Sequence, residues 1–243
     1  MKWVWRIWSM SWSELSLGPG TWILAVLAGG VLGMDAVSWP QIMVSRPLVS
    51  ATIGGWLLGN PAAGMLVGAV LEIYALRHPP FGAAKYPDTG PAGLVAGASY
   101  AASGGAAMGA LLLSIAVGWG LAWIGTVTVH VRRRLNERIM SPAGVLAADP
   151  GLLEQRHRMA IWLDALRGAI LVAAFLVPSV LAVTLVVGTG PSSLGRYAIA
   201  SLVLGLAASA GAAGRASAFG VRGWPLILVG AGLGLLLVWG GLT

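Results

Sequence analysis

The 243-residue chain contains no cysteine and few charged side chains. Without cysteine it can form no disulfide, no thiolate metal site and no cysteine nucleophile. Charged residues make up 9% of the chain, against about 25% in soluble domains, whereas hydrophobic residues make up 57%. This balance predicts an integral membrane protein and gives no sign of a separate soluble domain.

The sparse ionisable residues exclude further kinds of site. His78, His130 and His157 lie far apart and lack the spacing of metal ligands, so we expect no metal and no other cofactor. No nucleophile–base motif and no phosphate-binding glycine loop after a strand occurs, which argues against self-contained catalysis. Six of the fifteen lysines and arginines fall between residues 130 and 160. This clustering is typical of a cytoplasmic loop under the positive-inside rule, and it argues against a nucleic-acid-binding surface.

The apolar stretches predict an all-α, polytopic membrane protein with about seven apolar segments. No charged residue occurs between positions 89 and 129, which is enough for two passes of about 20 residues each. Ser103-Gly104-Gly105 is expected to divide them because small residues relax the backbone. The full passes are expected at Ala92–Ala107, Met108–Val129, Gly168–Val187, Tyr197–Ala213 and Trp224–Trp239.

The first third of the chain has shorter apolar segments. Thr21–Met34 and Pro47–Leu58 are too short for ordinary spans, and Ala62–Leu76 is expected to be a helix that ends before two prolines. Short segments interrupted by glycine and proline are typical of broken or re-entrant helices, whose exposed backbone is tolerated only where it lines a cavity. The first third is therefore the expected binding region.

The chain divides into an N-terminal segment and a membrane domain. Residues 1–18 are predicted to form an amphipathic helix in the headgroup layer, or alternatively a partner-binding surface, because tryptophans recur on one helical face. Residues 19–243 are predicted to form a single membrane domain. Within it, residues 19–129 carry the candidate site, 130–160 form a charged cytoplasmic loop, and 161–243 supply the C-terminal helices.

Glu72 is the strongest candidate site residue. A charge at the bilayer centre costs roughly 3 kcal/mol or more, so such residues face a cavity, pair with each other or mark a substrate path. Gly64, Gly68 and Glu72 are spaced by four and therefore lie on one helix face, although the two glycines alone are a common packing motif. Glu72 must contact a polar ligand, pair with a base such as Arg46 or Lys85, or be protonated. The sequence leaves these alternatives open.

Other polar residues extend the candidate site. Arg46 precedes a proline that suits the first turn of a helix, where backbone N–H groups are unpaired. Gln41, Ser45 and Asn60 lie nearby, but each could cap a helix end, and capping is the preferred interpretation for Asn60. Asp88 is either an N-cap or an acid that converges with Glu72 at one membrane depth.

Asp164 and Arg167 precede a long apolar run. They are three residues apart, so they can pair on one face of a helix that enters the membrane. We interpret them as structural or as a partner contact.

Several short pieces occur together as an ordered set over about 55 residues: Arg46-Pro47-Leu48, Leu57-Leu58-Gly59-Asn60, Gly64 with Gly68, Leu71-Glu72 with Ala75-Leu76, and Gly82-Ala83-Ala84 with Pro87-Asp88. In order and spacing this set resembles the membrane-spanning IIC subunit of mannose/fructose/sorbose-type sugar phosphotransferase systems (PTS).

The resemblance implies a multi-pass sugar permease subunit in the bacterial inner membrane, working as an oligomer with a IID-like membrane subunit. Cytoplasmic IIA and IIB proteins would relay phosphate and carry the phosphohistidines, so the chain itself would bind a hexose near the membrane midplane and pass it to IIB. It also implies that Glu72 and Asp88 contact sugar hydroxyls, while Arg46 orients the broken helix or pairs with an acid. Gln41, Ser45 and Asn60 complete the candidate substrate-binding set.

Two other functions compete with transport. The segment around Gln41 is less polar than in the family, and the amino terminus is rich in tryptophan, which together favour a non-transporting membrane scaffold or regulatory subunit built on the same fold. Asn60 also stands where an acid is usual in the family. An intramembrane enzyme would use Glu72 and Asp88 as acid and base, but no nucleophile or metal set accompanies them.

Overall fold

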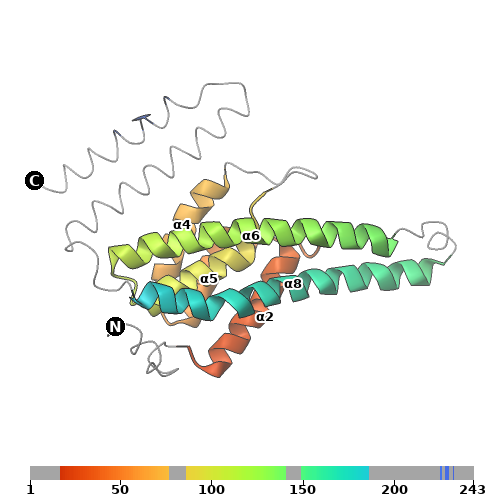
Figure 1. Cartoon of the computed structure of the whole chain (residues 1–243), viewed down its shortest axis with the longest axis horizontal. Coiled ribbons are helices and arrows are strands. Elements are labelled where there is room, and N and C mark those ends of the chain that lie inside the picture. Colours follow the sequence, from red (N-terminus) through yellow and green to blue (C-terminus); the bar gives the residue numbers. More distant parts are fainter. Residues whose placement is uncertain are drawn as a thin grey trace, which may run out of the picture.

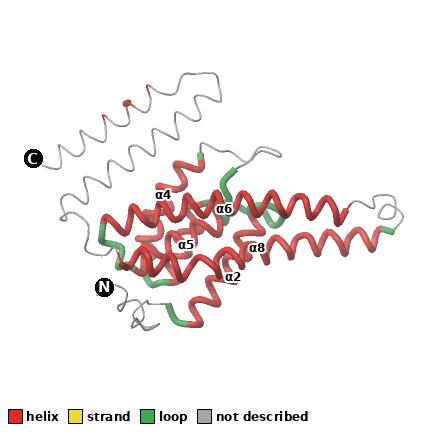
Figure 2. Tube along the Cα trace, viewed as in Figure 1, coloured by secondary structure: helices red, strands yellow, loops and turns green. Residues whose placement is uncertain are grey.

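The computed structural model describes residues 17–76, 86–140 and 149–185, with isolated positions at 225, 228, 229 and 232. Within these ranges the chain is helical, with no strand (Figures 1 and 2). The all-α prediction is confirmed. The N-terminal amphipathic segment and the pass at Tyr197–Ala213 lie outside the described residues, as does most of Trp224–Trp239. The helices are α2 (Pro19–Asp35), α3 (Pro47–Leu57), α4 (Pro61–Ala75), α5 (Thr89–Ala102), α6 (Met108–Met140) and α8 (Pro150–Leu185).

The first three helices are short and each begins with proline. Pro19, Pro47 and Pro61 occupy the first turn, where the missing N–H would have no partner in the helix and the fixed φ suits the helix. α3 has 11 residues and is therefore about 16 Å long, well below the roughly 30 Å of the hydrocarbon core. The prediction of short apolar helices in this region is confirmed.

Helix α5 is the central element of the bundle. Every residue from Gly90 to Ala101 is buried, because α2, α3, α4, α6 and α8 all pack against it. α3 approaches closely at Gly54, where an added Cβ would collide with the carbonyl oxygen of Leu94. α5 ends before Gly104 and Gly105, which adopt φ of +85° and +66°. The predicted break at residues 103–105 is confirmed.

Helices α6 and α8 are much longer than the others. With 33 and 36 residues they measure about 50 and 54 Å, and they are the two helices in the described ranges that are long and apolar enough to cross a membrane. Their paired ends extend past the other described helices (Figure 1). The count of about seven apolar segments is thus not confirmed, although the six expected segments that fall in the described residues all form helices.

The expected loop over residues 130–160 is largely helical. α6 continues to Met140 and α8 already begins at Pro150, so the charged residues lie on two helical extensions, called here the arm (residues 130–140 and 149–160). The loop prediction was wrong because it treated charge as a helix boundary. Arginine, leucine and glutamate are good helix formers, and no glycine or proline occurs between 130 and 140.

Candidate functional site

The N-terminus of α3 lies against the end of α4, and Glu72 joins the two. Its Oε1 is 3.0 Å from Nε of Arg46, and its Oε2 accepts a hydrogen bond of 3.3 Å from the backbone N–H of Leu48. The carboxylate thus balances the charge of the Arg46 guanidinium. It also accepts from a backbone N–H in the first turn of α3, which has no partner within the helix. Of the alternatives left open by the sequence, the structure shows the ion pair with Arg46.

The predicted stripe of Gly64, Gly68 and Glu72 is the face of α4 that contacts α3. A Cβ on Gly68 would lie 2.8 Å from the carbonyl oxygen of Pro47, and one on Gly64 would collide with the carbonyl oxygen of Ala51. The two glycines allow the backbones to touch, and this close packing brings Glu72 to the first turn of α3. The two glycines therefore act as a helix-packing motif, and Glu72 on the same face makes a polar contact.

Asp35 organises the loop before α3. It is 2% exposed, and its two carboxylate oxygens accept hydrogen bonds from the backbone N–H groups of Ile42, at 2.7 Å, and Ser45, at 2.9 Å. Within this loop Gln41 and Met43 adopt φ of +60° and +68°, and Gln41 is exposed. Sequence reasoning missed Asp35, although an acid that ends an apolar segment was a usable signal.

A small cavity lies beside the Arg46–Glu72 pair. Its volume is about 70 Å³, and the hydroxyl of Thr89 donates a hydrogen bond of 3.2 Å to the carbonyl oxygen of Ser45 at its edge. Tyr86 also lines it and donates to the carbonyl oxygen of Ala36 at 3.3 Å. The lining residues are Ala36, Ser45, Arg46, Ala75, Tyr86, Pro87 and Thr89. Typical small-molecule sites begin near 300 Å³, so a sugar would require this cavity to widen.

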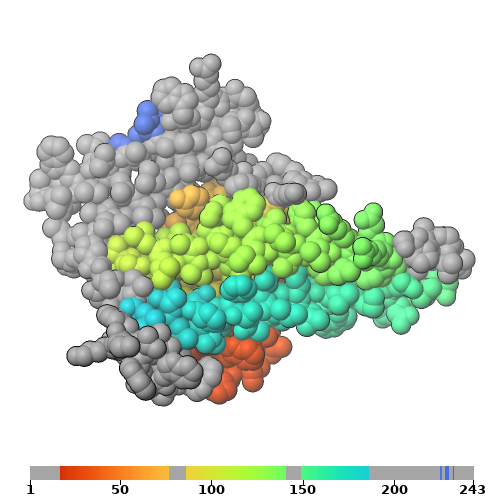
Figure 3. Space-filling model, in the orientation of Figure 1, coloured from red at the N-terminus to blue at the C-terminus, as the bar shows by residue number. Residues whose placement is uncertain are grey.

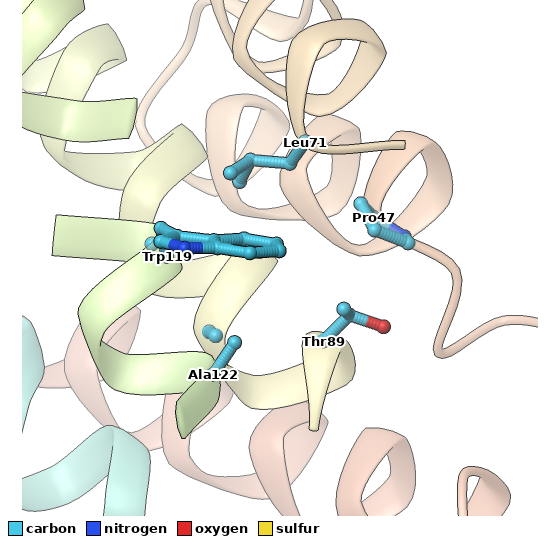
Figure 4. Close-up of a pocket in the computed structure, with 8 residues that line it drawn as sticks. Pro47, Leu71, Thr89, Trp119 and Ala122 are labelled. Atoms are coloured by element: carbon cyan, nitrogen blue, oxygen red, sulfur yellow. The ribbon is translucent and has the colours of Figure 1, made fainter. Parts of the chain in front are cut away.

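A second cavity lies deeper, between α3, α4, α5 and α6. In Figure 4 the ring of Trp119 extends between Leu71 and Ala122, toward Pro47 and Thr89 on the opposite wall. The remaining volume is about 10 Å³, roughly the space of one water molecule. Trp119 therefore fills the space through which the α3 N-terminus would otherwise connect to the bundle interior.

Asp88 is buried against Arg167 of α8, its ion-pair partner. The same guanidinium donates to the carbonyl oxygen of Gly33 at 3.0 Å and to the hydroxyl of Thr128 at 3.2 Å. Asp88 does occupy the N-cap position of α5, but its side chain makes no capping hydrogen bond. The predicted N-cap position is therefore confirmed, but the side chain of Asp88 pairs with Arg167 and does not cap the helix. The structure gives Asp88 and Glu72 different arginine partners.

Asp164 and Arg167 do not pair with each other. Asp164 is 3.2 Å from Nε of Arg132, while Arg167 pairs with Asp88. The predicted pair on one helix face was wrong because both side chains point to neighbouring helices. Their structural role is nonetheless clear, since all four groups of the two ion pairs are buried.

Asn60 caps α4. Its side-chain oxygen accepts a hydrogen bond of 3.1 Å from the backbone N–H of Ala63, as the capping interpretation predicted. Of the six candidate residues, the structure brings Arg46, Glu72 and Ser45 together at the start of α3. Asp88 and Asn60 are engaged elsewhere, and Gln41 lies on the exposed loop. Among the described residues, no group of three or more histidine or acidic side chains is placed to bind a metal ion.

Comparison with known proteins is consistent with this arrangement of elements. A family model described as "PTS system sorbose-specific iic component" matches residues 20–215. The chain is 37% identical over 67 residues to the PTS system sorbose-specific EIIC component of Lacticaseibacillus casei, a match that covers 28% of this chain and 24% of that protein. It is 31% identical over 151 residues to the PTS system mannose-specific EIIC component of Escherichia coli (strain K12), covering 61% and 54%.

These matches confirm the resemblance found in the sequence. The matched regions span about a quarter to a half of the length of these curated relatives. No solved structure matches the chain.

Proposed function

The chain belongs to the family of PTS system sorbose-specific IIC components, and from this membership we propose that it is the sugar-conducting membrane subunit of a phosphotransferase system. The substrate is a hexose, bound near the membrane midplane and passed to a cytoplasmic IIB protein for phosphorylation. A IID-like membrane subunit and a IIA protein complete the system. The location is the bacterial inner membrane, where the chain crosses several times and works as an oligomer.

One observation carries the assignment of the sugar site: the Arg46–Glu72 pair at the N-terminus of α3. A sugar hydroxyl both donates and accepts hydrogen bonds, so it could donate to the Glu72 carboxylate and accept from the Arg46 guanidinium. The side chains of Arg46 and Glu72 are 39% and 19% exposed, and Arg46 lines the small cavity. We place Ser45 and the exposed Gln41 at the edge of this site.

Asp88 and Asn60 are proposed to hold the surrounding backbone in place without touching the sugar. Asp88 fixes the start of α5 through Arg167, and the next residue, Thr89, bonds to Ser45. Asn60 fixes the turn between α3 and α4. We therefore revise their proposed role from sugar contact to positioning.

The test is sugar binding by membranes that contain the full chain, measured with radiolabelled mannose, fructose and sorbose. Glu72→Gln removes the negative charge that would accept a hydrogen bond from a sugar hydroxyl. Hydrogen bonds to charged groups contribute about 1.5–3 kcal/mol, so the affinity for the sugar should fall about 10- to 100-fold. The matched control is Glu154→Gln, which changes an exposed glutamate on the arm that pairs only with Arg158 at 3.7 Å.

Both variants are compared at equal protein content in the membrane. Saturable binding that is equal in Glu72→Gln and the wild type would refute the site. Because Glu72→Gln also leaves Arg46 without its acid, the double variant Arg46→Gln/Glu72→Gln checks that the loss does not come from an uncompensated guanidinium.

A second candidate function is a non-transporting scaffold or regulatory subunit on the same fold. It is favoured by the full engagement of the polar residues, since Glu72 and Asp88 each already have an arginine partner. Such a protein would assemble with its companion subunits yet bind none of the three sugars. Co-purification with a IID-like subunit, combined with no saturable binding, selects this function.

A further inference from the structure

An open apolar groove runs between α6 and α8, which together form one face of the molecule (Figure 3). Its volume is about 350 Å³, within the range of sites that bind small organic molecules. Among its walls, Val127 is 65% exposed, Leu166 53% and Ile170 56%. The groove is several times larger than the cavity beside Arg46 and is separate from it.

The groove lies where α6 leaves the hydrocarbon core. From Met108 to Val131 this helix has no charged residue, a length of about 36 Å that matches a core of roughly 30 Å. On α8, Trp162 is 72% exposed, and tryptophan is enriched at the level of the lipid headgroups. The apolar walls thus face acyl chains, and the outer end reaches the headgroup layer.

Arginines line the floor of the groove, and another follows its walls along α6. Arg134 is exposed and shares a helix face with Val127 and Val131, because the three are spaced by four and three residues. Arg132 and Arg167 line the floor, each more than nine-tenths buried. Nη1 of Arg132 and Nε of Arg167 have no hydrogen-bond acceptor among the described residues. Their own acids are Asp164 and Asp88, which leaves these donors unused.

We propose that this groove binds one anionic phospholipid, with an acyl chain along Val127, Val131, Leu166 and Ile170 and the phosphate beside Arg134. The walls match a hydrocarbon chain, and the guanidinium groups match phosphate and ester oxygens. The arm as a whole carries six arginines against the acids Glu137, Asp149 and Glu154, with Asp164 just beyond it. Positive charge beside a membrane segment attracts anionic lipid by about 1 kcal/mol per residue.

The test titrates the purified full chain in mild detergent with phosphatidylglycerol, or with phosphatidylcholine of the same acyl chains, and counts bound lipid by native mass spectrometry. The wild type should bind the first phosphatidylglycerol at least tenfold more tightly than phosphatidylcholine. Arg134→Gln should lose this preference. Ile170→Trp, which fills the groove, should weaken binding of both lipids.

The matched control is Arg158→Gln, an exposed arginine of the same arm that lies on α8 and pairs with Glu154 at 3.7 Å. It should bind both lipids as the wild type does. The proposal is overturned if Arg134→Gln prefers phosphatidylglycerol over phosphatidylcholine as strongly as Arg158→Gln does. It is also overturned if Ile170→Trp binds both lipids as tightly as the wild type. A protein subunit cross-linked to Leu166→Cys in native membranes, in place of lipid, also overturns it. Far-UV circular dichroism confirms that each variant is folded.

Discussion

At the scale of single residues, Arg167 connects several helices. From α8 it reaches Asp88 at the start of α5, the last turn of α2 at Gly33, and Thr128 on α6. Four helices therefore meet at one buried guanidinium. Removing one partner of a buried ion pair is strongly destabilising, because it leaves the other charge uncompensated in a medium of low polarity.

We expect Arg167→Met to lower the free energy of unfolding by about 3–5 kcal/mol. The double variant Asp88→Asn/Arg167→Met should recover part of that loss, since no net charge then remains buried at this point. Denaturant unfolding of the purified chain measures both, and Arg158→Met, at an exposed arginine, is the control. A double variant that is as unstable as the sum of its two single variants would show that the pair is not coupled.

The sequence predicted some side-chain contacts correctly and missed others. Asn60 was correctly interpreted as a cap because its partner, Ala63, is three positions away. The Arg167–Asp88 pair joins positions 79 apart, and the closer Asp164 offered a plausible but wrong partner. Glu72 and Arg46 were recognised as possible partners because few charges exist in the apolar stretch between them.

At the scale of helices, glycines set the distance between α3 and α4. A Cβ on Gly55 would lie 2.6 Å from the carbonyl oxygen of Asn60 and 2.8 Å from Cα of Gly64. These neighbours are backbone atoms and cannot rotate away. The position of Glu72 relative to α3 depends on this approach.

Gly55→Ala should destabilise the chain by about 1–3 kcal/mol through overpacking and should weaken sugar binding, because it separates α3 from α4. Gly120→Ala is the matched control: it lies within α6 with open space around its Cα, where alanine should stabilise the helix by up to about 1 kcal/mol. Thermal unfolding followed by circular dichroism gives the stability. Equal stability of the two variants would contradict the packing argument.

The bounds of the three short helices were predicted to within two residues at both ends. Proline sets the first turn of α2, α3 and α4, so apolar segments that follow it could be placed within a few residues. The ends of α6 and the start of α8 were misplaced because charged side chains were read as loop. Whether a charged stretch is helical depends on its neighbour, here the other half of the arm, and a single sequence does not show that pairing.

At the scale of the whole molecule, the arm should identify the cytoplasmic side. The chain has no cysteine, so Glu137→Cys and Glu154→Cys each introduce a single thiol on the exposed arm. A membrane-impermeant maleimide should label them only after spheroplasts are permeabilised, because arginine-rich segments stay on the cytoplasmic side. Gly120→Cys, within the apolar part of α6, should be labelled in neither state. Labelling of Glu137→Cys in intact spheroplasts would reverse the orientation.

The family and the all-helical architecture could be derived from the sequence, since both depend on composition and on a compact set of motifs. The burial of α5 by five other helices could not, because it depends on which faces of those helices meet.

α8 is a single helix from Pro150 on the arm to Leu185, with Pro178 inside it. The helix is held near its middle, where Arg167 is bonded to three other elements and Gly168 lies against Gly33. Arg167 pairs with Asp88, and the adjoining Thr89 donates a hydrogen bond to Ser45 beside the small cavity. One ion pair, one peptide bond and one hydrogen bond therefore separate α8 from the lining of that cavity.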